Sequence, residues 1–183
     1  MTADHLQGVV PAGPRDLKRA VRRHPAGVAV VTVATPQGPA GFTATSLASA
    51  SADPPMLSFN VSRSSSVWPQ VEAARHVAVH LLTEEQEDLA VRFAARGADR
   101  FAPPTVWAPG PFGVPVLGGV SAWLVGEVEG VLPAGGNAVV VARVLHVETP
   151  SEPSPPLVHH DGRYRRLVPD RSRLRLVARD DRT

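Results

Sequence analysis

A series of short Val-rich runs, each ended by a Gly- or Pro-containing turn, constrains the fold of this chain most strongly. The runs that predict strands are 28–35, 41–49, 56–61, 76–82, 121–132 and 138–147. β-Branched residues favour strands, and Gly and Pro favour the turns that end them. The strands follow one another mainly as hairpins, without the βαβαβ alternation of a parallel sheet. The pattern therefore predicts a mainly β fold, an antiparallel β-barrel with a few peripheral α-helices.

Three short amphipathic segments predict the peripheral helices. They span about 14–23, 64–74 and 83–93, and each places apolar residues three or four positions apart. Between the last of these helices and the next strand, residues 96–115 are rich in Gly and Pro and predict a long irregular loop. The loop contains Phe101 and Trp107, and these aromatic residues argue against disorder.

The composition is that of a single folded domain without disulfides. Hydrophobic residues make up 43% of the 183 positions, enough for a buried core. We expect a flexible arm over 1–13, one domain over 14–168 and an Arg-rich tail over 169–183. Cys is absent, which excludes disulfides, thiolate metal sites and a cysteine nucleophile. No apolar run approaches the roughly 18 residues of a membrane span, and the N-terminus lacks a signal-peptide pattern, so we expect a cytoplasmic protein with no membrane partner.

The sequence pI of about 9.9 overstates the positive charge of the protein. The formal net charge is only +2, and Lys18 is the single lysine. With one tyrosine and no Cys, few groups can release a proton above neutral pH, and this raises the pI. A nucleic-acid partner is therefore not expected. The seven His residues are scattered and no three possible ligands share a metal-binding spacing, so no metal site is expected.

Residues 41–55 combine small side chains with many hydroxyl groups. Small residues in a strand allow another backbone or a flat ligand to approach closely. The hydroxyls of Thr43, Thr45 and Ser46 supply hydrogen-bond donors and acceptors that rotate to suit a polar rim. Composition alone leaves two interpretations open, a ligand-binding surface and an ordinary solvent-facing edge strand.

An ordered series of landmarks resembles the flavin reductase-like family, whose members have the FMN-binding split-barrel fold. The landmarks are Arg23-His24-Pro25-Ala26-Gly27-Val28, Gly41-Phe42-Thr43-Ala44-Thr45-Ser46, Asp53-Pro54-Pro55, Ser62-Arg63-Ser64-Ser65, Arg100-Phe101, Pro115-Val116-Leu117-Gly118-Gly119 and His160-Asp161-Gly162-Arg163-Tyr164. They stand in the order found in the family and cover about residues 18–168. The resemblance implies an antiparallel split β-barrel.

The resemblance also implies a binding site for FMN or FAD. The implied cofactor-binding residues are Thr43, Ala44, Thr45, Ser46, Ser49, Ala50, Ser51, Asn60, Ser64, Ser66, Arg100, Phe101, His160 and Tyr164. Residues 43–46 would follow the polar edge of the isoalloxazine ring, and residues 49–51 would lie at the same edge. Asn60 and residues 64–66 would lie near the ribityl chain or the phosphate. Arg100 would bind the phosphate. His160 and Tyr164 resemble C-terminal residues that cover the flavin, often in a homodimer.

The activity implied by the resemblance is hydride transfer from NADH or NADPH to the flavin. The reduced flavin would then diffuse to a flavin-dependent monooxygenase. Such a reaction needs positioned rings and excluded water more than a nucleophile or a strong acid, which fits a chain without a nucleophile constellation.

The turn between the last two long strands departs from the pattern of the family. Many of its reductases carry Gly-Asp-His there, with the His near the nicotinamide, whereas this chain has Gly135-Gly136-Asn137. Asn137 is therefore our candidate for the nicotinamide side of the site. The change leaves open an alternative function, a split-barrel protein that binds flavin or heme without efficient NAD(P)H turnover.

Overall fold

The computed structural model describes residues 10–150 and 154–167. Its centre is a seven-stranded antiparallel sheet with the strand order β3-β2-β6-β9-β10-β5-β4. The strands are β2 (Ala29–Thr35), β3 (Gly38–Ala44), β4 (Ala48–Ala52), β5 (Pro55–Ser62), β6 (His76–Leu81), β9 (Ala122–Ala134) and β10 (Asn137–Glu148). The predicted mainly β, antiparallel fold is confirmed. The expected Arg-rich tail lies outside the described residues.

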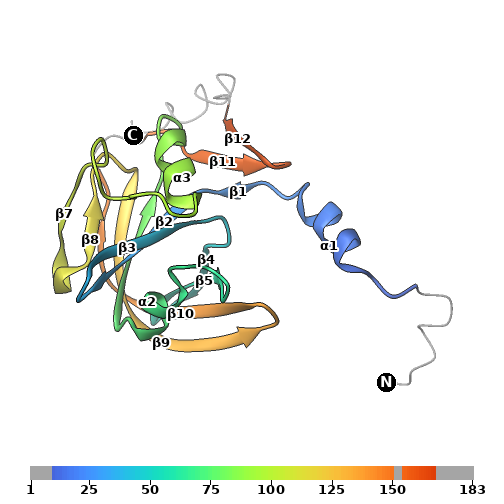
Figure 1. Cartoon of the computed structure of the whole chain (residues 1–183), viewed down its shortest axis with the longest axis horizontal. Helices are drawn as coiled ribbons and strands as arrows, with labels where there is room; N and C mark the ends of the chain where they lie inside the picture. Colours follow the sequence, from blue (N-terminus) through green and yellow to red (C-terminus); the bar gives the residue numbers. More distant parts are fainter. Residues whose placement is uncertain (1–9, 151–153, 168–183) are drawn as a thin grey trace, which may run out of the picture.

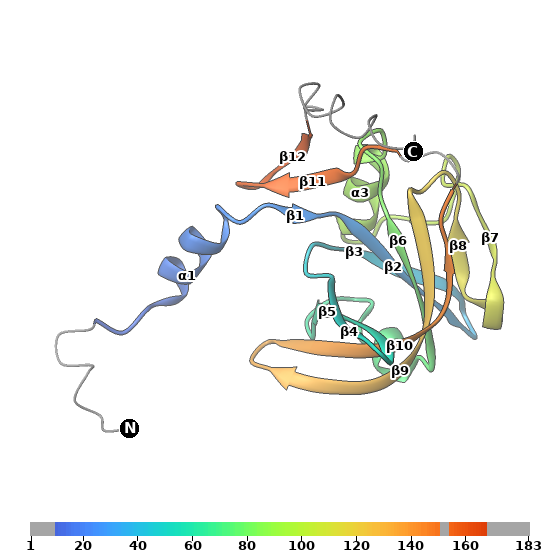
Figure 2. The same ribbon diagram turned by 180° about the vertical axis from the view of Figure 1, so that it is seen from behind.

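The sheet is strongly curled, and its two edge strands are consecutive in the chain. Only residues 45–47 separate β3 at one edge from β4 at the other. The curl also brings Ser46 to β5, where its Oγ accepts a hydrogen bond of 2.8 Å from the backbone N–H of Asn60. Figure 1 and Figure 2 show the resulting half-open barrel from opposite sides.

Within the described residues, two small sheets and three α-helices surround the barrel. One sheet joins β1 (Ala26–Gly27), β11 (Leu157–His160) and β12 (Arg163–Arg166), and the other is the hairpin of β7 (Trp107–Pro109) and β8 (Pro115–Leu117). The helices are α1 (Pro14–Val21), α2 (Trp68–Ala73) and α3 (Glu87–Ala94), and a 3-10 turn, η2, spans Pro111–Gly113. In both views α1 extends away from the barrel, and none of its side chains is buried.

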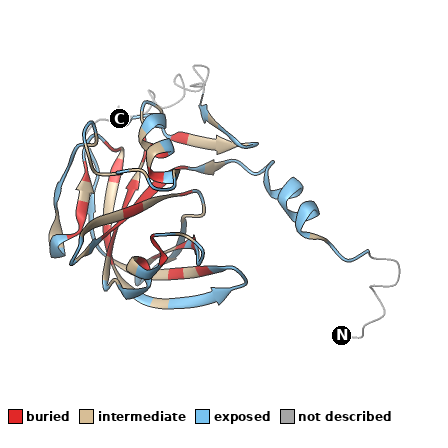
Figure 3. Cartoon of the chain, viewed as in Figure 1, coloured by how far each residue is buried: buried red, intermediate tan, exposed pale blue. Residues whose placement is uncertain are grey.

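The core lies inside the barrel and beneath α3. Val-rich segments of β2 and β6 are almost completely buried, as Figure 3 shows, whereas α1 and the far end of the β9–β10 hairpin are exposed. Phe93 of α3 has no exposed surface and packs with Leu82 and Leu117. Burial of these side chains provides the main driving force for folding.

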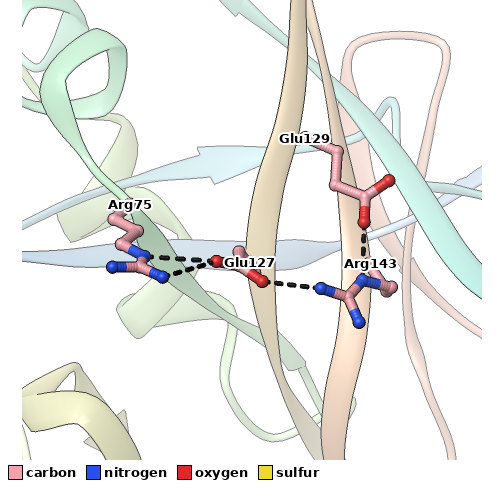
Figure 4. Close-up of polar contacts among 4 residues, drawn as sticks. All are labelled: Arg75, Glu127, Glu129 and Arg143. Carbon is pink, nitrogen blue, oxygen red and sulfur yellow. Dashed lines mark hydrogen bonds and ion pairs between the residues drawn. The ribbon is translucent and has the colours of Figure 1, made fainter.

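A network of charges reinforces the outer side of β9 and β10 (Figure 4). The Glu127 carboxylate accepts from Arg75 at 3.1 Å and from Arg143 at 2.7 Å, and Arg143 also pairs with Glu129. The hydrogen bond from Arg75 lowers the pKa of Glu127. The hydrogen bond to Glu129 raises the pKa of Arg143. The network therefore favours the charged forms of both partners across the ladder.

Four predicted boundaries were wrong. The strand expected over 41–49 ends at Ala44, because residues 45–47 turn to the far edge of the sheet. The helix expected from residue 64 begins at Trp68, since Ser62, Ser64 and Ser65 form local turn hydrogen bonds. The helix expected from residue 83 begins at Glu87, after a turn in which the Gln86 side chain accepts from the N–H of Thr83. The loop over 96–115 contains β7 and η2, whose shortness hid them from periodicity.

Candidate functional site

A pocket of about 360 Å³ opens where β3, the 45–47 link, β5 and the end of α3 meet. Its size is in the range of small-molecule sites. The lining is rich in hydroxyl groups and consists of Phe42, Thr43, Ala44, Thr45, Ser46, Asn60, Val61, Ser62, Ser64, Ser65, Ser66, Phe93, Ala94, Arg96 and Arg100. The pocket thus combines apolar walls with polar groups and two guanidinium groups.

Local hydrogen bonds fix the hydroxyl side of the pocket. The Oγ atoms of Ser62 and Ser64 lie 2.9 Å apart, and the N–H of Ser64 donates to the Ser62 Oγ. The Ser65 Oγ accepts from the N–H of Val67 at the start of α2. These bonds hold the chain between β5 and α2 in one conformation, so that its serines face a common space.

The hydroxyl of Thr43 has a structural role. Its Oγ1 donates to the backbone carbonyl of Ala90 at 2.6 Å, which ties β3 to α3. The hydroxyl is thus already engaged within the protein. The Thr45 side chain, by contrast, is exposed at the mouth of the pocket, beside Ser46.

Two arginines contribute the positive charge of the pocket. Arg100 is partly buried, and it donates through Nε to the carbonyl of Phe93 (3.1 Å) and through Nη2 to that of Ala95 (2.6 Å). Burial lowers the pKa of Arg100. Arg96 is exposed and lines the same pocket. Arg96, at the start of the predicted loop and four residues before Arg100, was not among the predicted flavin-binding residues.

The structure brings about half of the expected flavin-binding residues together. Thr43, Ala44, Thr45, Ser46, Asn60, Ser64, Ser66 and Arg100 all line the pocket. Ser65, within the predicted segment 64–66, lines the pocket too, and so does Ser62, which was not among the predicted flavin-binding residues. The Ser62-Arg63-Ser64-Ser65 landmark contained the signal for both.

Ser49 and Ser51 line a different pocket. That pocket measures about 350 Å³, has a mainly apolar lining, and is formed by Leu47 and residues of β4, β5, β6, β9 and β10. Ala50 lies between them in β4 and is exposed. The separation follows from the strand break after Ala44, because β4 pairs with β5 instead of continuing β3.

The remaining expected residues lie outside the hydroxyl-lined pocket of the same chain. Phe101 packs edge-on against Phe93 and Trp107, at centroid distances of 5.2 and 5.4 Å. His160 and Tyr164 lie on β11 and β12, where burial is the main cause that raises the pKa of Tyr164. His160 and Tyr164 are distant in sequence from the segments that line the pocket, so a local sequence pattern cannot predict where they lie relative to it.

Asn137 lies near the edge of the pocket. It is the register partner of Ser62 across the β5–β10 ladder, and the carbonyl of Gly136 accepts a hydrogen bond of 3.0 Å from the N–H of Arg63. The turn that differs from the family pattern is therefore attached to the serine-rich segment that lines the pocket.

Searches for two other kinds of site gave negative results. Residues 10–150 and 154–167 include no cluster of three His, Cys, Asp or Glu side chains that could bind a metal ion. Over the same residues, no helix is long and apolar enough to span a membrane.

Comparison with known proteins gives concordant results. Among curated proteins, an NADH:FMN oxidoreductase of Rhodococcus erythropolis is 43% identical over 157 residues, which are 84% of this chain and 82% of that protein. HsaB, the reductase subunit of a flavin-dependent monooxygenase of Mycobacterium tuberculosis, is 30% identical over 160 residues, 87% of this chain and 85% of that protein.

A solved structure extends the similarity to three dimensions. The NADH:FAD oxidoreductase SgcE6 of Streptomyces globisporus, in complex with NAD and FAD fragments, superposes with a TM-score of 0.81 and 28% identity, over 89% of this chain and 99% of that chain. Residues 21–168 match the family described as "Flavin reductase like domain". On these grounds, the chain belongs to the flavin reductase-like domain family.

Proposed function

We propose that this protein reduces FMN with NADH and supplies the reduced flavin to a separate flavin-dependent monooxygenase. The observation that carries the proposal is the hydroxyl-lined pocket with two arginines, which lies in a chain of the flavin reductase-like family. The names of the two curated relatives support the substrate pair and the partner class. FAD and NADPH are the alternative substrates.

The lining of the pocket fits the parts of FMN. Phe42, Val61 and Phe93 form apolar walls for a flat ring. Main-chain groups of residues 43–46, together with the hydroxyls of Thr45 and Ser46, provide partners for the polar ring edge. Asn60 and the serines of 62–66 suit the ribityl hydroxyls, and the two arginines mark the anionic end.

The contribution of the protein to the reaction is binding and orientation. When bound, FMN supplies the electron acceptor for the hydride of the dihydronicotinamide. The strand β3 and the 45–47 link would hold one edge of the flavin ring, and the apolar walls would keep water from the face of the ring. No Asp, Glu or His side chain lines the pocket within the described residues, which suits a transfer that needs no strong acid.

A steady-state assay tests the proposal. Purified protein mixed with NADH and free FMN should consume NADH at a kcat on the order of 10 per second. The same assay with FAD and with NADPH ranks the substrates. NADH consumption no faster than that of flavin without protein, for every pairing, would contradict the proposal.

The turn at Asn137 gives a first prediction for the nicotinamide side. An amide donates hydrogen bonds but neither carries charge nor stacks as an imidazole does, so we expect Asn137→His to raise kcat/KM for NADH several-fold, with the affinity for FMN unchanged. Asn137→Ala should lower kcat/KM by a similar factor. Equal NADH kinetics in all three proteins would remove Asn137 from the site. A wild-type protein that binds flavin but leaves NAD(P)H unoxidised would favour the alternative, a flavin carrier.

We further propose that the protein acts as a homodimer in the cytoplasm. Two features support pairing: the exposed apolar side chains of α1 and the outer edge of β4, with which no other described strand pairs. His160 and Tyr164 would then cover the pocket of the partner copy. The mass of the protein in solution, measured by light scattering, tests the dimer.

A further inference from the structure

Helix α1 is attached to its own chain only at its C-terminal end. Arg22, the residue after α1, forms an ion pair of 3.1 Å through Nε with the Asp161 carboxylate, and its Nη2 donates to the Asp161 carbonyl. The N–H of Asp161 in turn donates to the carbonyl of Arg22 at 2.9 Å. These bonds hold the end of α1 beside the turn between β11 and β12, while the rest of the helix extends away from the barrel (Figures 1 and 2).

One face of α1 carries two apolar side chains that no described residue buries. Leu17 and Val21 are exposed and stand four positions apart, so they lie on the same face of the helix, one turn from each other. This is the spacing with which an amphipathic helix anchors itself in an apolar groove. The charged residues of the helix are three bases and one acid, namely Arg15, Lys18, Arg19 and Asp16.

The barrel of the same chain carries an apolar groove. It is the pocket of about 350 Å³ that Ser49 and Ser51 line. Val147 at this groove is exposed. The large apolar side chains of the lining are Leu47, Met56, Leu81, Leu124, Val144 and Val147. The groove therefore offers the kind of surface that the exposed face of α1 requires.

The charges next to the groove are complementary to those of α1. Asp53 lies in the turn between β4 and β5, next to lining residues of both strands, and Glu148 directly follows Val147. The nearby base on β10, Arg143, is already paired with two glutamates. The surroundings of the groove are thus acidic, whereas α1 is basic, and opposite charges of this kind fix the orientation of two docked surfaces.

We propose that α1 of one copy inserts Leu17 and Val21 into the apolar groove of a second copy, which returns its own α1 in the same way. The inference rests on the homodimer of the proposed function and names the surfaces that form it. Each chain carries both the helix face and the groove, so a two-fold axis that joins one pair also joins the other. This reciprocal exchange covers all four surfaces, which favours a second copy over an unrelated partner.

Chemical cross-linking of introduced thiols tests this contact. The chain contains no Cys, so the introduced thiols are the only ones. The double variant Val21→Cys with Val147→Cys places one thiol on the helix face and one at the groove. Both positions are exposed, so the variant should fold as the wild type does. A short bismaleimide joins thiols that lie close together, and denaturing gel electrophoresis separates the covalent dimer from the monomer.

The double variant should form covalent dimer at least about tenfold faster than either single variant, because thiols held together react at a far higher effective concentration than thiols on separate molecules. Two further double variants are matched controls and should react as slowly as the single variants. Arg19→Cys with Val147→Cys places the helix thiol on the opposite face of α1. Val21→Cys with Leu132→Cys moves the second thiol to an equally exposed apolar position outside the groove.

The position of any other cross-link would overturn the proposal. Covalent dimer from Val147→Cys alone would show that the two grooves face each other, and covalent dimer from Val21→Cys alone would show that the two helices pair. A cross-link within one chain of the double variant, identified by mass spectrometry, would show that α1 folds back into its own groove.

Sedimentation and NADH turnover of the wild type separate a failure of this contact from a failure of the proposed function. A dimeric and active wild type whose double variant gives no cross-link would retain the homodimer and the reductase activity but exclude this contact. A monomeric wild type would exclude both the homodimer and the contact. A cross-linked dimer without NADH turnover would leave the contact in place and contradict the proposed activity.

Discussion

At the scale of single residues, the small side chains of β3 serve the packing of α3 as well as the pocket. A Cβ on Gly41 would lie 2.7 Å from the carbonyl oxygen of Val31 and 3.0 Å from Cε1 of Phe93. The first neighbour is backbone and the second is a fully buried ring, so neither can move freely. Gly41 is thus required for the close approach of the helix that carries the end of the pocket.

We therefore predict that Gly41→Ala destabilises the protein by about 1–3 kcal/mol, the usual cost of overpacking. Gly130→Ala is the matched control in β9, because a Cβ there meets nothing within 4 Å. Unfolding in urea measures both. Equal stability of the two variants would show that the neighbours of Gly41 adapt without cost.

The sequence predicted the pocket only where its residues are near neighbours in the chain. The hydroxyl-rich link and the serines before α2 were anticipated, because turn chemistry is local. Ser49 lies outside the hydroxyl-lined pocket, and no local signal distinguishes a strand that continues from one that crosses to the far edge of a curled sheet.

At the scale of elements, α1 is a helix whose side chains no other described segment of the chain buries. Leu17 and Val21 are 64% and 56% exposed, and the helix projects from the barrel in both views (Figures 1 and 2). Isolated helices of eight residues are unstable in water, which favours a covering partner for this face.

The corresponding prediction concerns the homodimer. Leu17→Gln combined with Val21→Gln should increase the dissociation constant of the dimer about tenfold or more, whereas Lys18→Gln on the polar side should leave it unchanged. Sedimentation over a range of concentrations measures both variants. An unchanged association in the double variant would place the dimer contact elsewhere.

The order of the strands shows the limit of prediction at this scale. Strand segments and hairpins follow from β-branched runs and turns, so β2, β5, β6, β9 and β10 were anticipated closely. The closure of the barrel through residues 45–47 depends on the twist of the whole sheet, which no short segment encodes.

At the scale of the whole molecule, one buried imidazole makes the fold sensitive to acid. His80 has no exposed surface, its Nδ1–H donates to the carbonyl of Val30 at 3.0 Å, and its Nε2 has no partner in the described structure. Burial lowers its pKa from 6.5 to about 4. The folded protein therefore holds His80 neutral.

Stability should consequently fall as the pH decreases from about 6.5 to about 4, because over this range the unfolded chain binds a proton that the folded chain does not. The loss amounts to about 3 kcal/mol and levels off below the lower value. His80→Gln keeps a donor for the carbonyl of Val30. This variant should be less stable at neutral pH, but its stability should change less as the pH decreases. Urea unfolding across this pH range gives both curves, and parallel curves would exclude His80 as the cause.

The central claim, that the pocket presents a flavin to NADH, is tested most directly by stopped-flow mixing without oxygen. FMN and the protein are mixed with NADH, and the flavin absorbance band is followed. We predict rapid bleaching of the band, at a rate that saturates with NADH and falls when Asn137 is replaced by Ala. Bleaching no faster than in the mixture without protein would contradict it.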